Sequence, residues 1–214
     1  MLHGYDVSNH NLSFIEKAPL TVSGNDFLWM KATEGVTFTD CALDWYMTTY
    51  HDMPRGVYHY ARPENNSPKE EADHFLDTIW KYLEKSPLLL ALDWEDRALR
   101  YPQSWILEWM EAVEARVDGK PLIYIQASAL TDIPKVIAAD YGLWIAEWNN
   151  KVSPSYKGLW AFHQYNNSPL DINSFNGNLE QLHKYACSIK KDRPDSERPC
   201  CGNCMCCTRS KCVG

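Results

Sequence analysis

Asp93 and Glu95 end an apolar segment that reads LLLALDWE over residues 88–95. On a β-strand, side chains two positions apart point to the same face, about 6–7 Å apart along the backbone. Two carboxyl groups that lie close together do not both ionise freely, so the pKa of one of them rises. A carboxyl group with a raised pKa acts as a general acid at neutral pH. This pair therefore favours acid–base chemistry, and a pair of carboxyl groups is what most glycosidases use to cleave the bond between sugars.

Two further acids mark the ends of other apolar segments. Asp6 ends the first, 2–7, and Asp171 ends the last, 170–172. The distance between the carboxyl groups of Asp93 and Glu95 would decide the stereochemical outcome. About 5–5.5 Å suits a retaining glycosidase and about 6.5–9.5 Å an inverting one, so the sequence leaves both outcomes open. Aromatic residues at similar positions would line a groove for a sugar: Tyr58, Tyr60, Tyr124 and Trp148.

The elements that must position these acids are short apolar segments separated by amphipathic ones. Continuous apolar runs of this length are typical of strands buried on both faces of a parallel sheet. The sequence predicts strands over 2–7, 27–32, 56–61, 88–94, 121–125, 143–148, 159–165 and 170–172. It predicts helices over 40–52, 67–83, 103–117 and 178–190. In the first three, apolar residues recur every three or four positions, as on one face of a helix.

Strands that alternate with helices predict a parallel sheet with right-handed connections. Residues 166–169 are too few for a parallel crossover, so the last two strands should be antiparallel or joined by a tight turn. We expect an α/β fold: an irregular, TIM-like (β/α) barrel that has lost its helices in its last third. The alternative is an open doubly wound sheet, which needs a Gly-rich turn that residues 4–11 do not offer.

Composition narrows the function classes. A chain of 214 residues fits one domain, and a net charge of −7 argues against a main role in coating nucleic acid or an anionic membrane. The longest aliphatic run, 88–92, is far shorter than a membrane span, and residues 1–11 contain no apolar signal-peptide core. We therefore expect synthesis in a bacterial cytoplasm without a signal peptide, no membrane partner and no nucleic-acid partner.

Several segments together resemble glycoside hydrolase family 25, the Chalaropsis-type lysozymes common among phage endolysins. They occur in the family's order across residues 1 to about 185. The matching segments are GYDVS at 4–8, FLWMKATEG at 27–35, GVYHY at 56–60, LDWE at 92–95, WIAEW at 144–148, WAFHQY at 160–165 and LDINSF at 170–175.

The resemblance implies a (β/α)5β3 barrel and hydrolysis of the β-1,4 bond between N-acetylmuramic acid and N-acetylglucosamine in peptidoglycan, with no cofactor. It implies that Glu95 donates the proton and that Asp93 supports the reacting sugar, with Asp6 and Asp171 as supporting acids. Either the acetamido group of the sugar or Asp93 itself would be the attacking group. Groove residues carried over in the same way are Lys31, Tyr58, Tyr60, Tyr124, Trp148 and Gln164. An endolysin would reach the cell wall after a holin breaches the membrane.

Two other readings use the same barrel. A chitinase-type barrel carries a longer Asp-x-Asp-x-Glu run, and Ala91 occupies the first of those positions here. A sugar-binding barrel without activity would lack Asp93 or Glu95, and this sequence has both.

The end of the chain has a different composition. We expect the catalytic barrel to occupy residues 1–191, a polar linker 192–199 and a flexible Cys-rich tail 200–214. Four of the tail's thiols have a spacing that could form a zinc site: Cys201, Cys204, Cys207 and Cys212. The alternative is a flexible end whose thiols oxidise or bind metal adventitiously, and we expect no metal to take part in catalysis.

Overall fold

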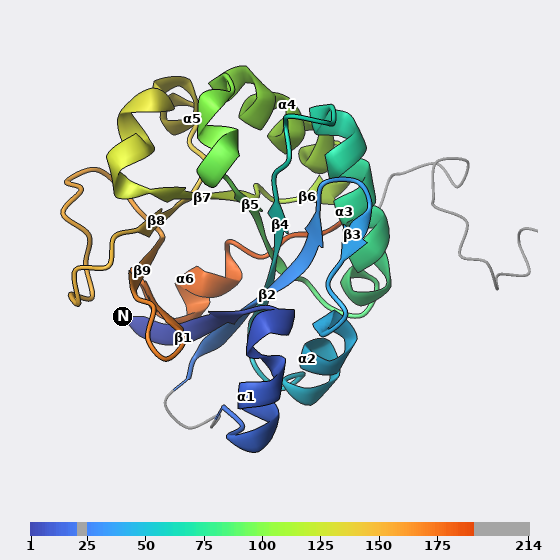
Figure 1. Ribbon diagram of the computed structural model, residues 1–214, viewed down its shortest axis with the longest axis vertical. Coiled ribbons are helices and arrows are strands. Elements are labelled where there is room, and N and C mark those ends of the chain that lie inside the picture. Colours follow the sequence, from blue (N-terminus) through green and yellow to red (C-terminus); the bar gives the residue numbers. More distant parts are fainter. Residues whose placement is uncertain (21–24, 191–214) are drawn as a thin grey trace, which may run out of the picture.

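Eight strands pair in a closed ring in the computed structural model, which describes residues 1–20 and 25–190 (Figure 1). β1 closes the ring because it pairs with β10 on one side and with β2 on the other. Around the ring the order is β1 (Leu2–Val7), β10 (Asp171–Phe175), β9 (Phe162–Asn166), β8 (Leu143–Ala146), β7 (Leu122–Gln126), β5 (Leu89–Asp93), β4 (Arg55–Tyr60) and β2 (Phe27–Glu34). The predicted linker 192–199 and Cys-rich tail, with its candidate zinc ligands, lie outside the described residues.

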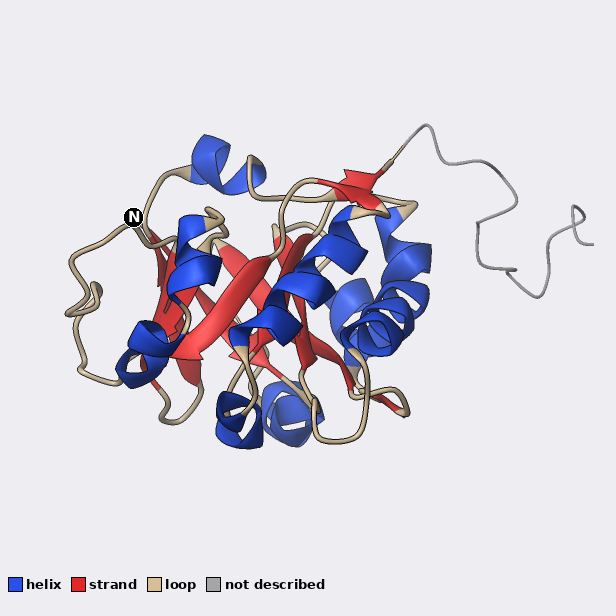
Figure 2. Cartoon of the chain, turned by 90° about the horizontal axis from the view of Figure 1, so that it is seen from above, coloured by secondary structure: helices blue, strands red, loops and turns tan. Residues whose placement is uncertain are grey.

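Helices follow the first five barrel strands and cover the outside of the ring (Figure 2). They are α1 (Leu12–Lys17), α2 (Leu43–Thr49), α3 (Pro68–Leu83), α4 (Gln103–Glu114) and α5 (Pro134–Ala138). From β8 onward the described chain passes to β9 with no helix, and β10 then pairs antiparallel with β9. The predicted barrel with a helix-poor last third is therefore confirmed.

α3 begins where its sequence predicts. The Ser67 hydroxyl accepts a hydrogen bond from the backbone N–H of Glu70, while the Glu70 side chain accepts one from the backbone N–H of Ser67. Pro68 follows at the first helical position, where a missing N–H costs nothing. The apolar face of the helix, which includes Phe75 and Ile79, is fully buried against the barrel.

Large aromatic side chains fill the inside of the barrel. Trp29 and Trp144 stack with their ring centroids 4.6 Å apart, and Phe162 packs edge-on against Trp29 at 5.3 Å. These rings lie against the backbone of neighbouring strands, where a side chain would clash with them. A Cβ at Gly56 would lie 2.3 Å from the Trp29 ring, and one at Gly4 would lie 2.2 Å from the carbonyl oxygen of Phe27. Glycine at both positions makes room for the aromatic core.

The predicted helix over 178–190 is wrong beyond its first turns. α6 spans only Leu179–His183, and the chain then extends into β11 (Ser188–Ile189), which pairs with β6 (Val117–Asp118). Cys187 exchanges two backbone hydrogen bonds with Leu88, at 3.0 and 2.7 Å. These long-range bonds satisfy the backbone groups that a longer helix would have paired internally.

The remaining short elements lie in the connections. They are β3 (Phe38–Thr39) and the 3₁₀ turns η1 (Asn9–Asn11), η2 (Asp96–Arg100) and η3 (Ala127–Asp132). Of the helices described, none is both long and apolar enough to cross a membrane.

Gly56→Ala should destabilise the fold by about 1–3 kcal/mol, because the added methyl group overpacks the barrel interior against the buried Trp29 ring. Urea unfolding followed by tryptophan fluorescence measures the loss. Gly158→Ala is the matched control, since its methyl group would meet only the far end of the Tyr156 side chain in a connecting segment. Equal stability of the two variants would contradict this account of the core.

Candidate active site

Three of the four predicted acids lie on strands at the same end of the barrel. Asp6 pairs in register with Asp171 across β1 and β10, which confirms that these two lie side by side. Asp171 begins its strand rather than ending it, a correction to the sequence prediction. Because β10 runs antiparallel to β1, its first residue reaches the rim where the parallel strands end. Asp93 is the last residue of β5 and pairs with Tyr60 and Tyr124 on the flanking strands.

Glu95 lies two residues beyond the end of β5, so it is not part of the strand as predicted. Its backbone is still extended, with φ −143° and ψ −176°, and Trp94 still donates a backbone hydrogen bond to Tyr124 of β7. Asp96 then turns the chain into η2 with φ +51°, a conformation that Asp adopts more readily than most residues. Glu95 is therefore held at the barrel rim between a paired strand end and a sharp turn.

Burial raises the pKa of all four acids. It raises the pKa of Glu95 to about 7, with further contributions from the negative charges of Asp96 and Asp6. It likewise raises the pKa of Asp171 to about 7, where Asp6 and Glu95 add to the effect. The Asp93 side chain is only 7% exposed, and burial together with the charge of Glu95 raises its pKa well above the usual range. Near neutral pH the cluster therefore holds protons.

Asp6 differs because neighbouring amides stabilise its charge. Burial raises its pKa to about 6, and hydrogen bonds from Asn173 and Gln164 counteract the rise. Asn173 Nδ2 donates to Asp6 Oδ2 at 2.6 Å, and Gln164 Nε2 donates to the same oxygen at 2.8 Å. Each amide is oriented in turn by a ring: Trp144 Nε1 donates to Asn173 Oδ1 at 2.8 Å, and Tyr124 Oη donates to Gln164 Oε1 at 3.0 Å.

Trp148 extends this network to the surface. Its Nε1 donates to Gln164 Oε1 at 2.8 Å, yet the side chain as a whole is 60% exposed. A tryptophan fixed by its N–H with an open ring is a suitable platform for a flat, partly apolar ligand. Tyr124 and Gln164 are buried, so these two predicted groove residues offer a ligand little surface and act through their hydrogen bonds.

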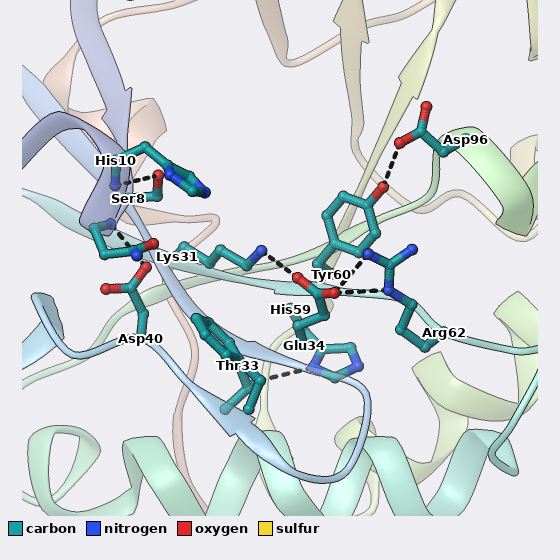
Figure 3. A network of polar contacts seen from close by, with 12 residues as sticks. Ser8, His10, Lys31, Thr33, Glu34, Asp40, His59, Tyr60, Arg62 and Asp96 are labelled. Carbon is teal, nitrogen blue, oxygen red and sulfur yellow. Dashed lines mark hydrogen bonds and ion pairs between the residues drawn. The ribbon is translucent and has the colours of Figure 1, made fainter.

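A group of charged residues centred on Glu34 includes Lys31, whose charge acts on Asp93. Figure 3 shows Lys31 and Arg62 converging on Glu34. Lys31 Nζ lies 2.5 Å from Glu34 Oε2, and Arg62 binds the other oxygen of Glu34 at 2.5 Å. The Lys31 ammonium group also lies 4.7 Å from the centre of the Tyr60 ring. Its positive charge lowers the pKa of Asp93 and of Glu95, against the larger effect of burial.

The two remaining predicted groove residues, Tyr58 and Tyr60, lie at different depths on β4. Tyr60 pairs with Asp93, and its hydroxyl group donates to Asp96 Oδ2 at 2.7 Å. Tyr58 lies two residues before Tyr60 on β4 and pairs with Ala91. Its ring packs edge-on against Trp144, with the ring centroids 6.2 Å apart. Burial raises the pKa of Tyr58 and the charges of Asp6 and Asp93 raise it further, so its phenol group stays neutral beside the acids.

Four residues of the site were not predicted from the sequence: Glu34, Arg62, Asp96 and Asn173. Glu34 and Asn173 stand inside segments that carried the family resemblance, 27–35 and 170–175, and this was the available signal. Arg62 and Asp96 lie in connections, where only the folded chain shows their partners.

Chemically, the site combines a proton donor with an unpaired acceptor. Glu95 has a pKa near neutrality, and the buried Oδ1 of Asp93 has no hydrogen-bond partner among the described residues. A ligand N–H or O–H group would satisfy that oxygen. Within residues 1–20 and 25–190, no group of three or more His, Cys, Asp or Glu side chains is placed to hold a metal ion.

Comparison with known proteins gives consistent matches. The model described as "Glycosyl hydrolases family 25" matches residues 5–173. Lysozyme M1 from Streptomyces globisporus is 29% identical over 206 residues, which cover 85% of this chain and 70% of that protein. The structure of a muramidase from Acremonium alcalophilum is 25% identical with a TM-score of 0.66, over 85% of this chain and 97% of that one. The multimodular pneumococcal cell wall endolysin from phage Cp-1 is also 25% identical, with a TM-score of 0.62, over 81% of this chain and 53% of that one.

Asp171→Asn should stabilise the protein at alkaline pH. The Asp171 pKa of about 7 exceeds that of an unfolded aspartate, so the folded state holds a proton that the unfolded state has lost between about pH 4 and pH 7. The free energy of unfolding therefore falls as the pH rises through this range. Asparagine has no charge to bury, and we expect a gain of about 1–3 kcal/mol at pH 8 with little change at pH 4.5.

Urea unfolding at both pH values measures this difference. The control is Asp118→Asn at an exposed position of β6, which should change stability little at either pH. A loss of stability at pH 8 in the Asp171 variant would show that its carboxylate is stabilising, contrary to the burial argument.

Proposed function

The chain belongs to glycosyl hydrolases family 25, and from this we propose that it is a lysozyme that cleaves the β-1,4 bond between N-acetylmuramic acid and N-acetylglucosamine in bacterial peptidoglycan. The observation that carries the proposal is the pairing of Glu95, whose pKa is about 7, with the buried Asp93 at the rim of the barrel. Two carboxyl groups of this kind are the usual apparatus for glycoside hydrolysis.

Glu95 serves as the general acid. With a pKa of about 7, it retains its proton at mildly acidic to neutral pH and donates it to the oxygen of the departing sugar. Burial and the negative charge of Asp96 keep the proton on Glu95 until the glycosidic oxygen accepts it. Part of the Glu95 side chain is accessible to solvent, as contact with a substrate requires.

Asp93 supports the reacting sugar. Its buried Oδ1 has no partner among the described residues, so it is an acceptor for the acetamido N–H of the sugar. This arrangement supports a route in which the acetamido oxygen attacks the anomeric carbon while Asp93 orients the nitrogen. Lys31 favours the charged form of Asp93 and so helps it to accept that hydrogen bond.

Asp6, Asp171 and Trp148 hold the sugar in this proposal. Asp171 is half-buried beside Asp6 and can bind sugar hydroxyl groups, whereas the buried Asp6 acts through its charge. The exposed ring of Trp148 offers a flat surface to the apolar face of a sugar. Its hydrogen bond to Gln164 links that surface to Asp6.

Glu95→Gln should reduce the rate of peptidoglycan cleavage by about 10²–10⁴-fold, because the amide keeps the shape of the side chain but has no acidic proton to transfer. Asp93→Asn should also be severe, and Asp6→Asn and Asp171→Asn should cost less. Release of soluble muropeptides measures the rate, with Glu108→Gln on the exposed face of α4 as the matched control.

Mass analysis of the released ends identifies the bond. A reducing muramic acid end is the expected product. A reducing glucosamine end would mean that the enzyme is a glucosaminidase, and wild-type turnover by Glu95→Gln would remove Glu95 from its proposed role. Intact folding with no cleavage of any peptidoglycan would favour a binding protein instead.

We also infer that the enzyme acts as a phage or prophage endolysin, released to the cell wall when a holin opens the membrane. The support is its likeness to the phage Cp-1 cell wall endolysin. Expression in a bacterial cytoplasm should then be tolerated, with lysis following only when the membrane is permeabilised. Turbidity and viable counts before and after permeabilisation measure this, and lysis without permeabilisation in a strain that lacks holins contradicts it.

A further inference from the structure

A cleft of about 960 Å³ lies beside the acid cluster and contains none of the residues predicted from the sequence to line the groove. Three connections form it: the one after β2, the one between β4 and α3, and η2. Asp96 joins the cleft to the active site, because it follows Glu95 directly and accepts the Tyr60 hydrogen bond (Figure 3). The volume of the cleft lies within the range of about 300–1,000 Å³ that is usual for ligand-binding pockets.

Unpaired positive charge distinguishes this cleft. Arg62 is bound to Glu34, but Arg97 and Arg100 form no ion pair within the described parts of the chain. Both are exposed, and they stand three positions apart on the 3₁₀ turn η2. Side chains with this spacing on a 3₁₀ turn lie one above the other. Two guanidinium groups thus lie on one face of the turn, ready to bind carboxylates.

The connection between β4 and α3, which also lines the cleft, offers an acceptor. Glu64 Oε2 is buried and has no hydrogen-bond partner among the described residues, while its other oxygen lies 3.9 Å from Arg62. A buried carboxylate oxygen without a donor is costly, and a peptide N–H group would satisfy it. By contrast, Phe38 is the single aromatic residue among the described residues that line the cleft, so they offer little surface on which a sugar ring could stack.

A buried network holds this wall in place. Glu71 is fully buried and accepts hydrogen bonds from the backbone N–H of Arg62 at 3.0 Å and from Asn66 Nδ2 at 2.8 Å. His59 Nε2 donates to Glu71 at 2.8 Å, since a carboxylate only accepts. Burial lowers the pKa of His59, so its neutral Nδ1 accepts from the Thr33 hydroxyl group of β2 at 2.7 Å. The barrel thereby fixes the β4–α3 connection before any ligand binds.

We propose that this cleft binds the acidic peptide that branches from the glycan strand, with peptide carboxylates on Arg97 and Arg100 and a peptide N–H group on Glu64. The inference rests on the proposed function, since peptidoglycan is the glycan that carries such peptides. The sugar chain then lies on the Trp148 side of the acids and the peptide on the η2 side. The cleft makes the enzyme prefer strands that carry peptides.

The test compares the full-length wild type with the double variant Arg97→Gln/Arg100→Gln on two substrates. One is soluble peptidoglycan strands with their peptides, and the other is the same strands after an amidase has removed the peptides. We expect the ratio of kcat/KM on the peptide-bearing strands to that on the stripped strands to fall about three- to tenfold in the variant, as two partly exposed charge pairs would contribute. Lys17→Gln/Lys135→Gln removes the same charge from exposed sites on α1 and α5 and should keep the wild-type ratio.

An unchanged ratio, or equal losses on both substrates, would overturn the proposal. If wild type cleaves neither substrate, the proposed function fails, and a binding measurement still tests the cleft. The peptide released by the amidase is titrated into the full-length protein while NMR signals of the arginine Nε–H groups are followed. Shifts at Arg97 and Arg100 that weaken with salt are expected, and no shift at either residue contradicts the proposal.

Discussion

A charged carboxyl group loses favourable hydration free energy when it leaves water. This protein places four such groups together at one end of its barrel, two buried and two half-buried. Part of the cost is offset locally: two amide groups donate to Asp6, and the Lys31 ammonium group opposes the repulsion around Asp93 and Glu95. The remainder is expressed as raised pKa values, because protonation removes the charge that burial disfavours. The property that makes the site able to donate a proton is therefore a direct result of its packing.

That packing depends on the aromatic residues beneath the acids. Trp29 and Trp144 fill the middle of the barrel, and the Trp144 indole also orients Asn173, which binds Asp6. The Trp144 ring thus supplies apolar surface that helps to exclude water from the acids. Through its hydrogen bond to Asn173 it also limits the rise in the pKa of Asp6. A polar or smaller interior would lose both at once, so the aromatic content of the sequence belongs to the site as much as to the core.

The sequence predicted most of the strands because buried parallel strands read as short apolar runs, and it predicted α3 from its capping residues. It also placed Asp6 beside Asp171, since the first and last strands of a closed barrel are neighbours. It did not predict the amide network. Gln164 and Asn173 reach Asp6 only in the register that the antiparallel β9–β10 pair adopts, which shifts between Ile172 and Asn173. Nor could it predict the cleft that Arg97 and Arg100 of η2 help to line, because its walls come from three connections far apart in the sequence.

The closing of the ring by β1 and β10 has a consequence for synthesis. Asp6 leaves the ribosome well before its partners Gln164 and Asn173, which follow 158 and 167 residues later. Pairings this distant in the chain form late in folding, because the intervening loop must close first. An incomplete chain that stops before β10 therefore has neither a closed ring nor a finished acid cluster. A nascent or prematurely ended product is an inactive one, and the enzyme gains its activity only when nearly the whole barrel has been translated.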